Sequence, residues 1–84
     1  TAVWNTAAPG TSESESRLRD FAGFQLTSGL LKAAKPECMV LHCLPAHREE
    51  EITAKVFEAH ANEIFDEAEN RLHAQKAVLV KLLG

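Results

Sequence analysis

The sequence lacks the features that would mark several classes of protein. Its net charge is only −3 over 84 residues, which gives neither the basic field that attracts nucleic acid nor an acidic tail. No apolar run approaches the roughly 20 residues that a membrane span needs. We therefore expect neither nucleic acid nor a membrane as a partner.

Cysteine is also scarce. The two cysteines, Cys38 and Cys43, accompany no secretory signal, so they indicate thiols in a reducing compartment rather than a disulfide framework. This usage predicts a cytoplasmic protein.

The length limits how much core the chain can build. A chain of 84 residues allows one small domain, which buries only about 60% of the surface of its unfolded state. The hydrophobic content of 45% is nevertheless that of a globular core. The first residues, Thr1–Trp4, resemble the end of a strand whose beginning is missing. We expect residues 1–84 to be a single partial domain.

The N-terminal half contains several local signals. Residues 5–16 are small and polar, with a Pro-Gly turn, and predict a flexible loop. Ser12 and Glu15 have capping-box spacing, so a helix from Ser12 to about Phe21 is an equally good interpretation. A short extended segment at Phe24–Leu26 follows, and then a helix that Thr27 or Ser28 caps and that stops before Pro36.

The fold class follows from the second half of the chain. Residues 38–42 are apolar without alternation, which is typical of a parallel strand covered on both faces. Ile52, Val56 and Phe57 recur at helical spacing, with the acids 49–51 expected in the first helical turn. The result is an α/β pattern.

The C-terminal segment predicts one more helix. Residues 63–65 read as extended, and Asp66 is the expected N-cap, with Glu69 at the reciprocal position. Lys76 and Lys81 lie towards the C-terminal end, where cations are favourable. Because residues 77–83 are apolar on nearly every side, we expect this helix to be buried against more than one neighbour.

Residues 41–48, Leu-His-Cys-Leu-Pro-Ala-His-Arg, form the candidate active-site edge. Pro45 cannot continue a central strand, because it lacks the backbone donor. The chain therefore turns there, and a thiol, two imidazoles and a guanidinium gather at the end of the predicted strand. In open α/β sheets, ligands bind beyond the carboxyl ends of strands.

This stretch and a later one resemble a known family. Residues 41–48, followed by Phe-Asp-Glu-Ala-Glu-Asn-Arg-Leu-His-Ala-Gln-Lys-Ala at 65–77, are similar to the C-terminal part of bacterial and archaeal ornithine carbamoyltransferases. Cys43 separates them from the sister aspartate enzymes. The resemblance covers the chain from Arg17 onward, in a family whose members are several times longer. It implies a fragment of a Rossmann-like, three-layer parallel-sheet domain that binds ornithine.

The resemblance also implies an activity. In the family, the ornithine side-chain amine attacks carbamoyl phosphate and gives citrulline and phosphate, without a cofactor. Cys43 would contact the end of the ornithine side chain, the Leu44 carbonyl would accept from the carbamoyl amide, and Arg71 would bind carbamoyl phosphate. The family has a separate carbamoyl-phosphate domain, absent here, and assembles as a homo-oligomer, a trimer.

One segment departs from the family pattern. The family motif is an acid followed shortly by Ser-Met-Gly, yet this chain reads Ala-Val-Trp-Asn-Thr-Ala-Ala at 2–8. Ala2 replaces the carboxylate that would hold the α-ammonium group of ornithine. Thr6 can stand in for the serine, but Ala7 and Ala8 do not match.

Other interpretations remain open. Without the resemblance, Cys43 would be a buried thiol and Arg71 a surface partner of Glu67. The chain could also be a catalytically inactive folding or self-association module that uses an exposed last helix.

Two further site classes have weaker patterns. A metal site would use Cys38, Cys43 and His47, with His60 or His73, but positions 38 and 43 leave opposite faces of a strand and no zinc spacing is present. A Cys43–His47 pair for thiol hydrolysis has no readable third group to orient it.

Overall fold

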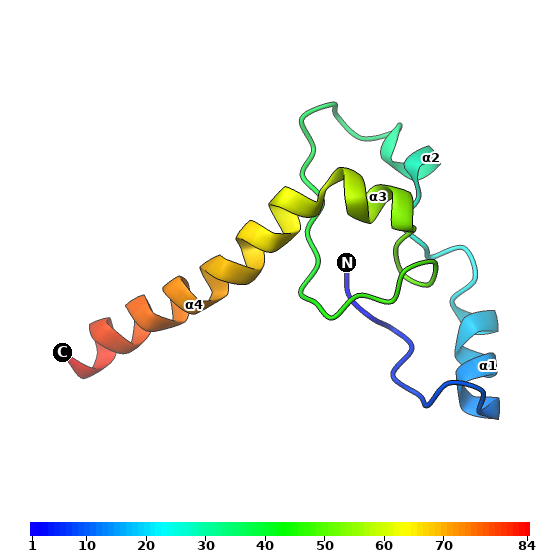
Figure 1. Ribbon diagram of the computed structural model, residues 1–84, viewed down its shortest axis with the longest axis horizontal. Helices are drawn as coiled ribbons and strands as arrows, with labels where there is room; N and C mark the ends of the chain where they lie inside the picture. The colour runs from blue at the N-terminus through cyan, green and yellow to red at the C-terminus, as the bar shows by residue number, and fades with distance from the viewer.

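The computed structural model describes all 84 residues and contains four helices and no strand (Figure 1). The helices are α1 (Ser12–Asp20), α2 (Ser28–Leu31), α3 (Ala54–Ala59) and α4 (Ala61–Leu83). Extended loops connect them, and two isolated parallel bridges, Leu26 to Ile52 and Arg48 to Ile52, are the only strand-like pairings. The parallel sheet of the expected α/β fold is therefore not formed within these residues.

The predicted strand at 38–42 is extended but is not a strand in this chain. The backbone N–H groups of Val40 and His42 donate to side chains of α4 instead of to a neighbouring strand. On the other edge, the Leu41 carbonyl accepts from the terminal amino group of Thr1 at 3.0 Å. A ladder needs neighbouring strands, and residues 1–84 supply only this single contact, so the prediction is wrong for this chain.

Threonine hydroxyls begin the three short helices. Thr27 caps α2, since its Oγ1 accepts from the Leu30 N–H at 3.1 Å, which confirms that prediction. Thr11, not Ser12, caps α1, so residues 12–16 of the expected loop are helical. Thr53 caps α3. A hydroxyl at this position satisfies an N–H group that has no partner inside the helix.

The acids at 49–51 lie in the turn before α3 rather than in its first turn, because the helix begins only after Thr53. Val56 and Phe57 are buried in α3, at the helical spacing that was expected. Ile52 is buried too, but precedes the helix.

The N-terminus of the last helix was predicted wrongly. α4 begins at Ala61, so residues 63–65 are helical and Asp66 lies inside the helix rather than capping it. The N-cap is His60, whose side chain makes no capping hydrogen bond. Ile64, at the end of the first turn, is fully buried. Burial of this side chain favours helix over the extended piece that local pattern alone suggested.

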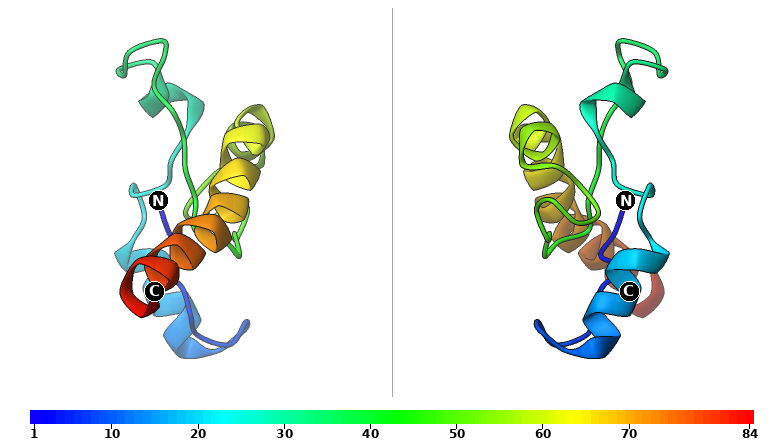
Figure 2. Two further views of the ribbon diagram at one scale, coloured as in Figure 1. Left: turned by 90° about the vertical axis from the view of Figure 1, so that its left-hand side faces the viewer. Right: turned by 90° about the vertical axis from the view of Figure 1, so that its right-hand side faces the viewer.

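The core is small and lies where α3, the start of α4 and the 40–52 loop meet. Its five buried apolar side chains are Val40, Ile52, Val56, Phe57 and Ile64. Beyond its first turns, α4 extends away from the rest of the molecule (Figures 1 and 2). None of the helices is both long enough and apolar enough to span a membrane.

The end of α4 is exposed, against expectation. Leu82 and Leu83 retain 76% and 82% of their accessible surface, and Val78, Leu79 and Val80 are also exposed. The prediction of a helix at residues 77–83 is confirmed, but the prediction that this part of the helix is buried is wrong for this chain. Residues 1–84 contain no element that covers it.

Candidate functional site

A buried histidine and glutamate hold the turn that follows the extended 38–42 segment. The side chains of His42 and Glu51 are both fully buried, and His42 Nε2 lies 2.7 Å from Glu51 Oε1. The same oxygen accepts from the His47 N–H at 2.7 Å. Two ends of the 42–47 turn are thus tied to one carboxyl group.

The hydrogen bonds also fix which ring nitrogen of His42 carries the proton. The Leu44 N–H donates to His42 Nδ1 at 2.8 Å, so Nδ1 must present its lone pair. Nε2 then carries the hydrogen and donates it to Glu51. The imidazole therefore orients Leu44 on one side while Glu51 orients the imidazole on the other. Glu51 Oε2 is buried without a partner.

Leu44 has an unusual backbone conformation at the centre of this turn. Its φ is +50°, a value that side-chain-bearing residues rarely adopt, and its peptide bond to Pro45 is cis. Its N–H is held by His42, but its carbonyl accepts no hydrogen bond. The turn therefore presents a backbone acceptor with no internal partner, next to the exposed thiol of Cys43.

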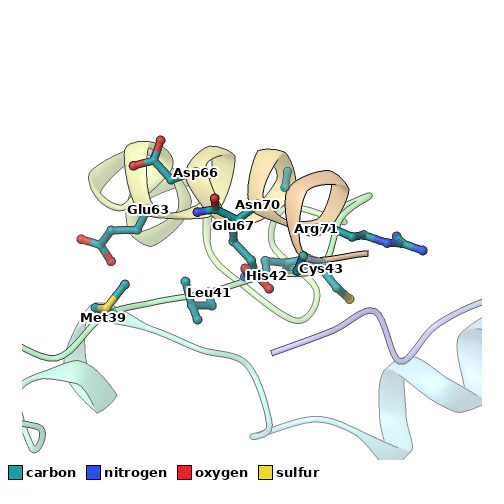
Figure 3. Close-up of a pocket in the computed structure, with 11 residues that line it drawn as sticks. Met39, Leu41, His42, Cys43, Glu63, Asp66, Glu67, Asn70 and Arg71 are labelled. Carbon is teal, nitrogen blue, oxygen red and sulfur yellow. Dashed lines mark hydrogen bonds between the residues drawn. The ribbon is translucent and has the colours of Figure 1, made fainter. Parts of the chain in front are cut away.

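A cavity of about 530 Å³ lies between the 39–43 segment and α4 (Figure 3). Met39 and Leu41 lie on one side, with Glu63 and Glu67 on the helix across from them. Cys43 and Arg71 lie towards the same end of this cavity. The helix therefore places Arg71 at the same end of the cavity as Cys43.

Glu63 has a perturbed acidity. The N–H of Val40, at 2.9 Å, lowers the pKa of this carboxyl below its ordinary value of 4.5, and the hydrogen bond with His60 lowers it further. Burial acts in the opposite direction and is outweighed. A depressed pKa means that the contact stabilises the fold above pH about 4.5 and is lost as the pH falls through the lower folded value.

A second cavity, of about 410 Å³, lies on the other side of Cys43. No acidic side chain lines it; its walls are Ala2, Val3, Thr6, Cys43, Leu44, Pro45 and His47. The Thr6 hydroxyl accepts from Arg17 Nη1 at 2.6 Å. Cys43 is therefore the residue that the two cavities share.

The structure brings the predicted site residues together in two groups. Thr6, Cys43 and Leu44 line the second cavity, and Cys43 and Arg71 line the first. The two purely structural interpretations of these residues are wrong. Cys43 is exposed rather than buried, and Glu67 contacts the His42 backbone rather than pairing with Arg71.

The metal interpretation finds no matching geometry. Nowhere do three His, Cys, Asp or Glu side chains gather so that they could hold a metal ion, and both cysteines are free thiols. His60 instead contacts Glu63, and His73 contacts Glu69.

Sequence reasoning missed Glu51 and Glu67. The side chain of Glu51 is fully buried, although it follows Glu49 and Glu50 in a run that looks like solvated charge. No local pattern separates the third acid from the first two. Glu67 lies four residues before Arg71 on the helix, and this spacing indicated an ion pair between the two side chains. Its partner in the structure is the His42 N–H.

Comparison with known proteins places this geometry in a family. A family model for the Asp/Orn binding domain of aspartate/ornithine carbamoyltransferase matches residues 1–82. Ornithine carbamoyltransferases from Synechococcus sp. and Archaeoglobus fulgidus are each 54% identical over all 84 residues. The chain spans about 27% of the length of these relatives.

Solved structures agree with the sequence comparison. The anabolic ornithine carbamoyltransferase of Campylobacter jejuni superposes with a TM-score of 0.86 at 37% identity, over 96% of this chain and 26% of that one. The enzyme from Pyrococcus furiosus superposes with a TM-score of 0.79 at 49% identity, over 93% of this chain and 25% of that one. The turn at Cys43, the helix that carries Arg71 and these matches together show that the chain belongs to the aspartate/ornithine carbamoyltransferase family, as part of its Asp/Orn binding domain.

Proposed function

We propose that this chain is the part of an ornithine carbamoyltransferase that receives ornithine and contributes to binding carbamoyl phosphate. The observation that supports this most is the position of Cys43. It lines one cavity together with Arg71 of α4 and a second cavity together with Leu44, whose carbonyl has no hydrogen-bond partner. Relatives that match the whole chain bear the name of this activity.

In the proposed reaction, the nitrogen lone pair of the ornithine side-chain amine attacks the carbonyl carbon of carbamoyl phosphate. A carbon–nitrogen bond forms, the carbon–oxygen bond to phosphate breaks, and phosphate leaves with the electron pair. The nitrogen loses one proton, and the product is citrulline. Because phosphate is already a good leaving group, positioning and charge stabilisation can carry the rate without a covalent enzyme intermediate.

Each site residue then has a role that suits its chemistry. Arg71 offers a planar fork of donors to a carbonyl or phosphate oxygen. The Leu44 carbonyl accepts from the carbamoyl amide, and Cys43 contacts the end of the ornithine side chain. Thr6 lines the ornithine side of the site, where its hydroxyl already accepts from Arg17.

The remaining contacts have to come from outside these 84 residues. The second cavity contains no carboxylate to face the α-ammonium group of ornithine, since alanine stands at position 2. Arg71 is the one cationic side chain in the first cavity, so most of the charge of carbamoyl phosphate needs partners elsewhere. We assign those partners to a carbamoyl-phosphate domain.

We further propose that residues 1–84 are one partial domain of a Rossmann-like, three-layer parallel sheet. The contact of Thr1 with Leu41 and the parallel bridge of Leu26 with Ile52 support this. Extended segments from distant parts of the chain already lie side by side there. Neighbouring strands would convert these single contacts into ladders.

A direct assay tests the proposed function. The 84-residue chain alone should form no citrulline from carbamoyl phosphate and ornithine, because Arg71 is the one cationic side chain at its first cavity and the other contacts to the phosphate are missing. A chimera in which residues 1–84 replace the matched segment of the Synechococcus sp. relative should be active. An inactive but folded chimera would contradict the proposal, and so would citrulline formation by the isolated chain.

The exposed end of α4 supports a second candidate function, self-association. Each such apolar side chain is worth roughly 1.5–3 kcal/mol when it is fully removed from water, and Leu72, Val78, Leu79, Val80, Leu82 and Leu83 are all exposed. We expect sedimentation of the isolated chain to show a dimer in the micromolar range, since a symmetric pair is the commonest closed assembly. Leu79→Glu and Leu83→Glu together should return it to a monomer. A monomer at every concentration would contradict this candidate.

A further inference from the structure

Two carboxylates of α4 bind the extended segment that leads to Cys43. Glu63 Oε2 accepts from the Val40 N–H at 2.9 Å, and Glu67 Oε2 accepts from the His42 N–H at 2.9 Å. The accepting residues are four apart on a helix, and the donating residues are two apart on an extended chain. The helix side chains therefore replace the acceptors of a neighbouring strand.

The spacing of these contacts has a geometric reason. Four residues of α-helix rise about 6 Å, and two residues of extended chain advance about 6.6 Å. The two repeats nearly match, so α4 and the 40–42 segment can run side by side in register over these two contacts. The next residue at this helical spacing after Glu63 and Glu67 is Arg71, which lines the cavity together with Cys43.

We propose that Glu67 is a positioning residue that sets this register and so places Arg71 at the same cavity as Cys43. The inference rests on the proposed function for its consequences in catalysis, but the contact itself can be tested without it. Glu67 does not touch a reacting atom. It acts through the backbone of His42, directly before Cys43, and through the helix one turn before Arg71.

The neighbouring contacts show why Glu67 matters more than Glu63. His42 is also fixed from its side chain, because its ring joins Glu51 to the Leu44 N–H. Glu67 therefore connects α4 to the hydrogen bonds that shape the turn. In Figure 3 its side chain extends from the helix towards His42. Glu63 binds two residues earlier, at Val40, and shares its oxygen with His60.

The first test measures hydrogen exchange of the His42 amide in the 84-residue chain. Glu67→Ala should speed this exchange by about 10-fold or more, because one hydrogen bond to a charged acceptor is lost. Glu67→Gln should restore most of the protection, since its amide oxygen can still accept. The matched control is Glu69→Ala, on the same helix, whose carboxylate contacts only His73 at 3.4 Å. A His42 amide that exchanges at the free rate in the unmodified chain overturns the inference.

The second test measures catalysis in the chimera. Glu67→Ala should lower kcat by about 10-fold with a smaller change in KM for ornithine, because a misplaced Arg71 weakens charge stabilisation in the transition state more than binding of the amine. Glu67→Gln should recover most of kcat, and Glu69→Ala should leave it unchanged. Equal losses for the alanine and glutamine variants would overturn a positioning role. An unmodified chimera without activity would count against the proposed function, while the exchange result would still decide the contact.

Discussion

Replacing Arg71 by alanine in the chimera should lower kcat by a factor of about 10² to 10³, the usual cost of removing one donor that stabilises charge in a transition state. Arg71 is exposed and makes no ion pair within residues 1–84. Its guanidinium is therefore available to a ligand rather than committed to the fold. The loss should appear in steady-state citrulline formation, with both substrates saturating.

Two companion variants make the Arg71 result specific. Arg71→Lys should recover only a small part of the rate, because an ammonium group cannot offer two parallel donors to one anion. Lys76→Ala removes an exposed cation from the same helix and should leave kcat within about 2-fold of the parent, since long-range surface charge is screened by salt. If Arg71→Ala retained nearly full kcat, the proposed role of Arg71 in binding carbamoyl phosphate would be wrong. Because Arg71 is exposed, folding should be unaffected, and circular dichroism should confirm this.

The parts of the fold that were predicted correctly depend on local contacts. Thr27 begins α2 because its hydroxyl reaches an N–H only three residues away, and such a contact can be read from neighbouring letters. The same holds for the helical spacing of Val56 and Phe57 in α3. Cys43 and Arg71 line one cavity, but their roles in binding substrate stay predictions.

The wrong predictions depend on partners that are distant or outside the chain. Residues 38–42 have the composition of a buried strand, but residues 1–84 supply acceptors from α4 and a single contact from Thr1. The apolar end of α4 likewise signals neighbours that these residues lack. The chain spans about 27% of the length of the relatives that it matches.

The start of α4 shows a different limit. Asp66 and Glu69 satisfy the letters of a capping box, yet burial of Ile64 extends the helix back to Ala61. Tertiary packing outweighs a cap that contributes about 1 kcal/mol. The sequence also could not predict which of the three acids at 49–51 is buried, because Glu51 is selected by its contact with His42 in the folded chain.

Glu51→Ala should cost the fold about 2–6 kcal/mol. The substitution leaves the His42 Nε2–H and the His47 N–H without the oxygen that now accepts from both. Each buried donor without a partner costs about 1–3 kcal/mol. Because a small domain has only about 5–15 kcal/mol of total stability, this variant is close to the limit of folding.

Urea unfolding of the chimera measures this cost, with two variants as references. Glu51→Gln keeps an amide oxygen that can accept from His42 and should lose less than half as much stability as the alanine variant. Glu58→Ala removes an exposed partner of Arg48 and should cost less than about 1 kcal/mol, as surface pairs generally do. If Glu51→Ala were as mild as Glu58→Ala, the carboxyl group would not be holding the turn. Contacts other than the Glu51–His42 hydrogen bond would then have to orient Leu44 and its carbonyl.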